Sequence, residues 1–294
     1  YTLARDMGVD LMHDQMKPLG FGQITGIDIL GESRGVLPST EWKRTTYKKP
    51  EQQRWYSGET ISLGIGQGYN NFTMLQIAHA MGTVANNGLK MKPHLVREVL
   101  DVETKASTPV AKEPIAQLSL APENLEVIKK GMIGVNIEGT SASSFIGAQY
   151  VSAGKTGTAQ VFTVKQNEKY NASSIDERMR DHALFVAFAP ADDPKVALAM
   201  VVENAGFGAQ NAAPIARRVF DFVIMGQYPS QEDIDAVQKG QATRPIGKPR
   251  AVASVPWPPK AAELAPDEIA EVASAAAKPA SAPKPAASTS SAAR

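Results

Sequence analysis

The 294-residue chain contains no cysteine. Disulfide bonds, thiolate metal sites and thiol redox chemistry are therefore excluded for this chain. No apolar run approaches the roughly 18 to 20 residues that span a bilayer, and no signal sequence is recognisable. Four histidines, at positions 13, 79, 94 and 182, lack the spacing of metal ligands. We therefore predict no metal site, and nothing in the sequence indicates a cofactor.

The chain also lacks an excess of either charge. It contains 31 Lys and Arg and 30 Asp and Glu, so its formal net charge is +1. General nucleic-acid binders carry a basic patch or stripe, so we do not expect nucleic acid as a partner. One local exception interleaves basic and aromatic residues at positions 42–50 and 54–56. Such a patch suits lipid headgroups, a phosphate-bearing substrate or single-stranded nucleic acid. A solvated surface loop is the interpretation that we favour.

The composition that remains, 43% hydrophobic and 21% charged residues, suffices for one sizeable core. From about residue 240 the sequence turns to Ala, Pro, Lys and Ser, as in residues 275–287. Too few large apolar side chains remain there to offset the entropy of ordering. We predict a folded domain over residues 1–228 and a largely disordered tail over residues 229–294.

Residues 151–162 alternate in character, which predicts a β-strand. One face would carry Ala153, Lys155, Gly157, Ala159 and Val161, and the other Ser152, Thr156, Thr158 and Gln160. Glycine within a strand often marks the close approach of another backbone. Such a strand could pair at its edge with an extended peptide, with the Lys155 ammonium as a point charge for a carboxylate. An ordinary edge strand with an exposed lysine is the plainer interpretation, and it stays open here.

Two other interpretations of Lys155 fail on the residues around it. A Walker-type phosphate loop needs glycine five residues before the Gly-Lys pair, where Gln149 stands. Ser152 and Lys155 have the Ser-x-x-Lys spacing, but that pair works on a helix, where positions three apart share a face. A strand points the two side chains in opposite directions. The other Ser-x-x-Lys, at residues 281–284, lies in the proline-rich tail, so neither serine is a credible nucleophile.

The segments after this strand predict a hairpin followed by a helix. Residues 182–189 and 195–203 are apolar runs of strand length with a proline-bounded turn between them, which indicates an antiparallel pair. Pro214 then opens a helix, and Gly226 lies just past its end. The expected apolar face of this helix consists of Ile215, Val219 and Val223, with Phe220 and Phe222 beside them. A sheet with a helix laid across it follows.

Upstream, the glycines of residues 64–68 precede a second helical segment. A dinucleotide-binding fingerprint would need glycine where Tyr69 stands. Thr73 and Gln76 instead form a capping box that starts the helix, and Gly88 is the expected C-terminal cap. The helical spacing of the apolar residues then predicts core packing and not cofactor contact. Those residues are Ile77, Ala80, Met81 and Val84.

The middle of the chain predicts smaller elements. We expect a strand at residues 95–101 and a hairpin, with residues 110–114 after it. Residues 121–124 open a helix that carries Leu125, Ile128 and Met132. Residues 139–144 form a loop that leads to the Lys155 strand.

Five short segments together carry a more specific pattern. They are Gly64-Ile65-Gly66-Gln67-Gly68, Leu75-Gln76, Ala85-Asn86-Asn87-Gly88, Pro93-His94-Leu95-Val96 and Gly154-Lys155-Thr156-Gly157-Thr158-Ala159. This set resembles the transpeptidase domain of class B penicillin-binding proteins, over residues 1–226. Residues 26–28, 38–43, 170–172 and 180–182 are similar to the elongation, rod-shape type within that family. One departure is Met74, where the family commonly has proline.

The resemblance implies a mixed α/β (α+β) fold of the penicillin-binding protein transpeptidase, or serine β-lactamase-like, type. We expect an antiparallel sheet flanked by helices and incomplete at its N-terminus. In the family, the Ser-x-x-Lys motif and the Ser-x-Asn or Ser-x-Asp motif both precede the region that matches residues 1–8. We therefore expect a C-terminal fragment that lacks the nucleophilic serine and is inactive alone. The Ser-x-Asp at residues 174–176 follows the Lys-Thr-Gly strand and is interpreted as coincidence.

The activity that the resemblance implies is a serine-type D,D-transpeptidase, which cross-links peptidoglycan stem peptides ending in D-Ala-D-Ala and which β-lactams inhibit. Lys155 would be catalytic and would attract the terminal carboxylate of the donor peptide. The hydroxyls of Thr156 and Thr158 would bind that carboxylate, and Gly157 would leave room for the substrate backbone. The Thr158 N–H would be one of two oxyanion donors, the other belonging to the absent serine.

The resemblance also implies a location and partners. The family is anchored in the bacterial inner membrane and acts on its periplasmic face, with the anchor upstream of the region seen here. Membrane-bound proteins of the elongation machinery, which maintains cell shape, are the expected partners. The alternative hypothesis is a non-catalytic interaction module of that machinery that keeps the transpeptidase fold. A reading frame that lacks Ser-x-x-Lys upstream would favour this alternative.

Overall fold

The structure, a computed structural model, describes residues 1–161, 175–241 and 244–255. Contacts divide the chain into residues 1–252 and 253–294, and nearly all of the second unit lies outside the described residues. The predictions for Phe162, residues 170–172, Ser174 and residues 275–287 also fall outside them. Within the described ranges, no helix combines the length and apolar character that crossing a membrane requires.

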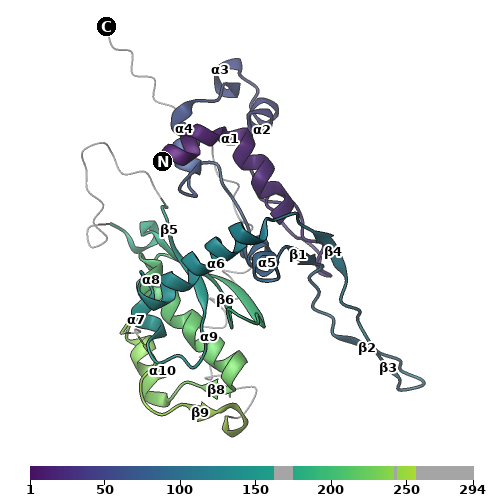
Figure 1. The fold of residues 1–294 in the computed structure, drawn as a ribbon, viewed down its shortest axis with the longest axis vertical. Coiled ribbons are helices and arrows are strands. Elements are labelled where there is room, and N and C mark those ends of the chain that lie inside the picture. The colour runs from purple at the N-terminus through teal and green to yellow at the C-terminus, as the bar shows by residue number, and fades with distance from the viewer. Residues whose placement is uncertain (162–174, 242–243, 256–294) are drawn as a thin grey trace, which may run out of the picture. The chain divides into compact units, whose positions relative to one another are not determined.

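Helices α1 to α5 come first along the described chain, and groups of short strands and further helices follow (Figure 1). The helices are α1 (Thr2–Met16), α2 (Thr40–Thr46), α3 (Pro50–Gln53), α4 (Ser57–Leu63), α5 (Met74–Ala85), α6 (Pro122–Ile137), α7 (Ala142–Phe145), α8 (Gly208–Asn211), α9 (Ala213–Met225) and α10 (Gln231–Gln238). The strands are β1 (Leu89–Met91), β2 (Glu98–Leu100), β3 (Ser107–Pro109), β4 (Pro114–Gln117), β5 (Ala153–Ala159), β6 (His182–Ala189), β7 (Val196–Val202), β8 (Gln227–Tyr228) and β9 (Arg250–Ala251). Single 3-10 turns are η1 (Lys17–Leu19), η3 (Glu177–Met179) and η4 (Val252–Ser254).

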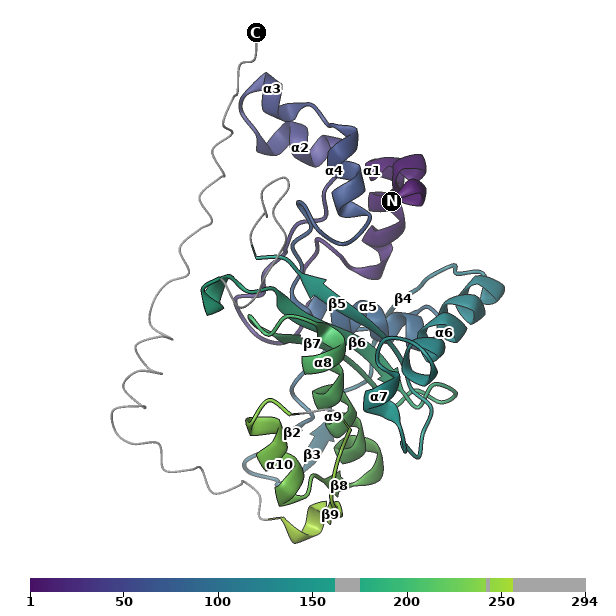
Figure 2. The same cartoon turned by 90° about the vertical axis from the view of Figure 1, so that its left-hand side faces the viewer.

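The largest described sheet has the order β5-β6-β7, with both pairs antiparallel (Figure 2). The predicted hairpin of β6 and β7 is therefore confirmed. The predicted strand at residues 151–162 is also confirmed, although β5 begins at Ala153 and ends at Ala159. In the register of β5 and β6, Lys155 lies opposite Val186 and Gly157 lies opposite Leu184.

Hydrophobic side chains cover both faces of this sheet. On one face, alternate residues of β6 pack against α7 and α9, and small side chains allow the helix to approach closely. This cluster consists of Phe145, Ala183, Phe185, Ala187, Ala189, Ala212, Ala213, Ala216 and Phe220. On the other face, Phe188 of β6 and Ala153 of β5 pack with Ala85 of α5 and Met132 of α6.

Helix α9 begins and ends as predicted, with Pro214 in its first turn and Gly226 as a left-handed C-cap at φ 61°. Its predicted apolar face is wrong, because Val219 and Val223 are exposed. The buried face instead carries Ala213, Ala216, Phe220 and two arginines, Arg217 and Arg218. Both arginines are paired with carboxylates. A pattern that counts charged residues as exposed therefore selects the wrong face.

The capping box of α5 is confirmed. The Gln76 N–H donates to Thr73 Oγ1 at 3.1 Å, and the Thr73 N–H donates to Gln76 Oε1 at 3.0 Å. The helix ends at Ala85. Gly88 has φ 88°, and its N–H donates to Thr83 O at 2.8 Å, so this glycine does close the helix end.

The hairpin expected after residues 95–101 does form, but its second strand is β3 at Ser107–Pro109 and not residues 110–114. Strand β2 pairs with β3, and β4 pairs with β1. The reason lies in a tight turn after β2, where the Asp101 carboxylate accepts hydrogen bonds from the N–H groups of Glu103 and Thr104. This Asx-type turn reverses the chain earlier than the residue pattern indicates.

The basic and aromatic patch is solvated in part, because Arg44, Lys48, Lys49 and Arg54 are exposed. It runs through α2 and the segments on either side of α3, and its rings Trp42, Tyr47 and Trp55 pack against Tyr69. Lys43 is only 3% exposed. Its ammonium donates to Arg54 O at 2.8 Å, pairs with Glu59, and lies 5.4 Å from the centre of the Trp55 ring. Lys43 and the packed aromatic rings of the patch therefore stabilise the fold.

Candidate active site

Strand β5 carries all four residues that the sequence singles out, Lys155, Thr156, Gly157 and Thr158. In the sheet as the described residues form it, β5 is an edge strand whose partner is β6. Lys155 is exposed and the other three residues are partly buried. The edge of β5 that faces away from β6 can therefore receive an extended peptide by strand addition.

Two carbonyls of β5 accept hydrogen bonds from side chains. Lys155 Nζ donates to Thr156 O at 2.7 Å, and Gln67 Nε2 donates to Thr158 O at 3.1 Å. In an antiparallel pair, alternate residues direct both backbone groups away from the partner strand. Thr156 and Thr158 are two residues apart, so their side-chain donors indicate that this alternate set faces the open edge. The N–H of Thr158 then faces that edge as well.

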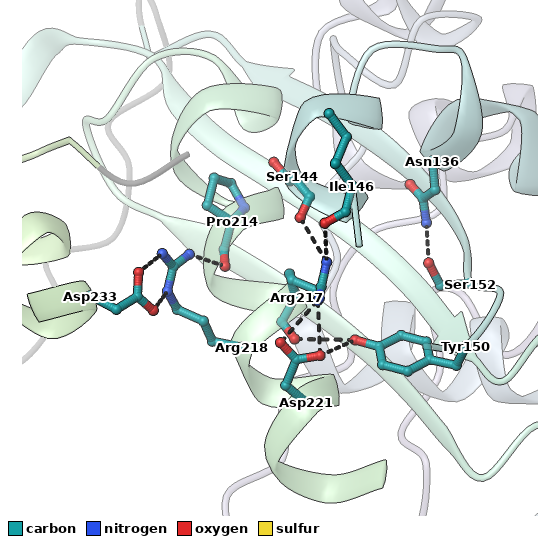
Figure 3. Close-up of polar contacts among 10 residues, drawn as sticks. All are labelled: Asn136, Ser144, Ile146, Tyr150, Ser152, Pro214, Arg217, Arg218, Asp221 and Asp233. Atoms are coloured by element: carbon teal, nitrogen blue, oxygen red, sulfur yellow. Dashed lines mark hydrogen bonds and ion pairs between the residues drawn. The ribbon is translucent and has the colours of Figure 1, made fainter. Parts of the chain in front are cut away.

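Ser152 lies just before β5 and is 3% exposed. Its hydroxyl accepts from Asn136 Nδ2 at 2.9 Å, and Asn136 Oδ1 accepts from Ser141 Oγ at 2.6 Å (Figure 3 shows the first of these bonds). Because Ser152 is buried and Lys155 is exposed, the two do not form a Ser-x-x-Lys pair, as the strand predicts. The serine instead fixes the start of β5 to the end of α6.

Close backbone packing explains the glycines of this region. A Cβ at Gly154 would lie 2.5 Å from Phe185 Cζ, and one at Gly157 would lie 3.2 Å from Leu184 Cβ. A Cβ at Gly208, the first residue of α8, would lie 2.1 Å from Leu184 O and 2.5 Å from Gly157 O. Helix α8 thus rests directly on the backbones of β5 and β6. The role of Gly157 in leaving room for a substrate stays a prediction.

The segment that leads into β5 is anchored to α9 by a buried polar group (Figure 3). Arg217 Nη1 donates to Ser144 O and Ile146 O at 3.3 and 3.2 Å. Arg217 Nε and the Tyr150 hydroxyl both donate to Asp221, at 2.8 and 2.9 Å. Burial, reinforced by the Asp221 carboxylate, raises the pKa of Tyr150 above its ordinary value. Tyr150 therefore remains a neutral donor over the physiological range.

His182 makes a structural hydrogen bond at the start of β6. It lies opposite Ala159 in the sheet, and its Nδ1 accepts from the Asn204 N–H at 2.9 Å. Among the described residues, no group of three or more His, Asp or Glu side chains is placed to hold a metal ion.

Two residues that contact β5 are missed by sequence reasoning. Gln67 donates to Thr158 O across 91 positions, and Thr140 Oγ1 lies 3.0 Å from Thr156 Oγ1. Gln67 is inside the glycine-rich segment, and its side chain carries no local signal of the distant carbonyl that it meets. Thr140 is in the loop before α7, and nothing local in the sequence indicates which strand residue it meets.

Known proteins resemble the chain in sequence. The profile of the family described as "Penicillin binding protein transpeptidase domain" matches residues 1–221. The peptidoglycan D,D-transpeptidase MrdA of Haemophilus influenzae is 42% identical over 241 residues, which cover 79% of this chain and 35% of that protein. MrdA of Escherichia coli K12 is 40% identical over 228 residues, covering 77% of this chain and 35% of that protein.

Solved structures resemble the chain in fold. PBP2 of Pseudomonas aeruginosa, solved in complex with WCK 5153, has a TM-score of 0.61 and 38% identity, and the match covers 75% of this chain and 43% of that one. PBP2 of Helicobacter pylori, solved in complex with MreC, has a TM-score of 0.60 and 27% identity, covering 77% of this chain and 38% of that one. The predicted transpeptidase fold, with its antiparallel sheet and flanking helices, is confirmed. The chain spans about a third of the length of the curated relatives it matches.

Proposed function

The chain belongs to the penicillin-binding protein transpeptidase family, and we propose that it forms part of a peptidoglycan D,D-transpeptidase of the elongation type. The observation that supports this most directly is the open edge of β5, with the Lys155 ammonium and the Thr158 N–H beside it. The reaction would be acyl transfer from a stem peptide ending in D-Ala-D-Ala, by way of an acyl-enzyme. β-Lactams would acylate the same serine.

In the proposed reaction, side chains bind the substrate carboxylate and a backbone N–H stabilises the oxyanion. Lys155 attracts the terminal carboxylate of the donor peptide, and the hydroxyls of Thr156 and Thr158 donate to it. The Thr158 N–H stabilises the oxyanion that forms when a serine attacks the penultimate carbonyl. Removing one such donor typically costs about two to three orders of magnitude in rate. The covalent intermediate requires a serine, and releases D-alanine before an amine of a second peptide takes the acyl group.

We propose that this serine is not Ser152 and that it belongs to a part of the protein other than the residues described here. Ser152 is buried and hydrogen-bonded to Asn136, so it is not available for attack. We therefore propose that the chain alone is inactive. Incubation with a fluorescent penicillin should leave no labelled band on a denaturing gel, and a stable band would overturn this assignment.

We extend the proposal to partners and location. Because the Helicobacter pylori PBP2 forms a complex with MreC, we propose that the protein containing this chain meets a similar protein of the elongation machinery. We place its action at the periplasmic face of the inner membrane, in the synthesis of the cell wall during elongation.

The test uses the longer protein that contains this chain. Lys155→Ala should lower the rate constant for acylation by a penicillin about 100-fold, because the antibiotic carboxylate loses its charged partner. Its melting temperature should stay that of the parent, since Lys155 is exposed. The matched control is Lys112→Ala, at an exposed lysine outside the helices and strands, which should acylate normally.

Two results would contradict the proposal. A Lys155→Ala protein that acylates as fast as the parent would remove Lys155 from the site. A parent protein that no penicillin acylates would favour the non-catalytic interaction module.

A further inference from the structure

The loop between α6 and α7 brings a second hydroxyl to the Lys-Thr-Gly strand. Thr140 Oγ1 lies 3.0 Å from Thr156 Oγ1, and either atom can be the donor. Thr140 is itself exposed. Its position must therefore be set by its neighbours in the chain.

Those neighbours are held firmly. Ser141 is fully buried, and its hydroxyl donates to Asn136 Oδ1 at 2.6 Å and lies 3.1 Å from Val135 O. Asn136 in turn donates to Ser152, at the entry of β5. A Cβ at Gly139 would lie 2.7 Å from Val135 Cα, so the backbone before Thr140 is packed against α6. One buried network thus fixes both the loop that carries Thr140 and the strand that carries Thr156.

The direction of the hydrogen bond decides what Thr156 can do. A threonine hydroxyl has one proton and two lone pairs. If Thr156 donates to Thr140, its proton is used and its oxygen turns only lone pairs toward an approaching anion. If Thr140 donates, the Thr156 proton is free to point at the anion. A carboxylate at the open edge of β5 selects the second arrangement, because a hydrogen bond to a charged acceptor is stronger than one between two hydroxyls.

We propose that Thr140 is a positioning residue, which donates its proton to Thr156 Oγ1 and so directs the Thr156 proton at the carboxylate of the bound peptide or β-lactam. This inference rests on the proposed function of β5. Thr140 does not touch the substrate, and it acts through Thr156.

The experiment measures the acylation rate constant of the longer protein with a penicillin and with its methyl ester. Thr140→Val, which keeps the shape and removes the hydroxyl, should slow acylation by the penicillin about three- to ten-fold, the range expected for one net hydrogen bond. The neutral ester should show no such loss. Thr140→Ser restores the hydroxyl and should restore the rate. Thr108→Val, at an exposed threonine of β3, is the matched control and should behave as the parent.

A double-mutant cycle separates this role from general support of the loop. With Thr156→Val in the background, Thr140→Val should cost nothing further, because there is no hydroxyl left to direct. An equal loss in both backgrounds, or an equal loss for penicillin and ester, overturns the inference. If Thr140→Val does not fold, Thr140→Ala also removes the hydroxyl and can replace it in the cycle. A parent protein that is not acylated would contradict the proposed function. A parent that is acylated, together with a Thr140→Val protein that is acylated at the same rate, would contradict only the role of Thr140.

Discussion

At the scale of single residues, Glu59 is the acceptor that balances the buried Lys43. It pairs with the Lys43 ammonium, and it accepts from the Tyr56 N–H and the Tyr69 hydroxyl, each at 2.9 Å. Burial opposes ionisation of Glu59, but these three donors outweigh it and hold the pKa of the carboxyl below its ordinary value. Because this pKa is depressed on folding, the carboxylate contributes stability that is fully present above the ordinary pKa of a glutamate. That contribution is lost as the pH falls through the lower, folded-state pKa.

Glu59→Gln should therefore lower the free energy of unfolding at pH 7 by about 2 kcal/mol, since it leaves Lys43 buried beside a neutral group. This loss of unfolding free energy is smaller than for a fully buried ion pair, because the Glu59 side chain is 22% exposed to solvent. The difference between variant and parent should shrink between pH 5 and pH 3, as melting temperatures over that range would record. Glu126→Gln, in an exposed pair with Lys130, is the control and should change little. A constant difference at every pH would contradict the role given to the Glu59 charge.

At the scale of elements, the contact of α8 with β5 depends on Gly208. A side chain there would meet the carbonyl oxygens of Leu184 and Gly157, which belong to the sheet and cannot turn aside. We expect Gly208→Ala to destabilise the fold by about 1–3 kcal/mol, the usual cost of overpacking, as measured by urea unfolding. Gly131→Ala is the control, because it sits in α6 with open space around it and should be neutral or slightly stabilising. A stable Gly208→Ala protein would show that α8 can move away from the strand.

The sequence predicts those elements whose signals are local. The capping box of α5, the ends of α9 and the pairing of β6 with β7 each depend on residues close together in the chain. The buried face of α9 is not predicted, because Arg217 and Arg218 find their partners only in three dimensions. The position of the strand that pairs with β2 is missed for a similar reason, since the Asp101 side chain decides where that chain turns.

At the scale of the whole molecule, the described fold continues past the family match, which ends at residue 221. Helix α10 is fixed to α9 by a buried ion pair, in which Arg218 Nε and Nη2 donate to the two oxygens of Asp233 at 2.8 and 2.5 Å (Figure 3). The Asp233 side chain is 1% exposed. The domain boundary expected after residue 228 stays a prediction. The ion pair joins Arg218, which lies before that boundary, to Asp233, which lies after it.

Asp233→Ala should lower the free energy of unfolding by about 3–5 kcal/mol, because it leaves the Arg218 guanidinium buried without its carboxylate. Urea unfolding would show the loss. Asp235→Ala on the same helix is the matched control. In the described contacts the Asp235 carboxylate accepts a hydrogen bond from the Gln231 side chain at the exposed surface. Equal stability of the two variants would mean that α10 contributes little to the domain.

The candidate site is predictable in part, and the limit is again one of distance along the chain. The alternation of residues 151–162 places Lys155 on a strand and separates it from Ser152. It does not reveal that Gln67 reaches Thr158, or that Thr140 reaches Thr156, because those contacts depend on how distant loops fold onto the sheet.

The bonds that Lys155 and Gln67 make to the edge of β5 also bear on selectivity. The outward carbonyls of Thr156 and Thr158 already have donors, at 2.7 and 3.1 Å, before any peptide arrives. A peptide that pairs with this edge therefore exchanges hydrogen bonds and gains few in number. When its N–H displaces Lys155, the ammonium needs a new acceptor. In the proposed reaction, a chain that ends in a carboxylate would supply one, whereas an amidated or continuing chain would leave the ammonium without an acceptor. The strand would then favour peptides with a free carboxylate end.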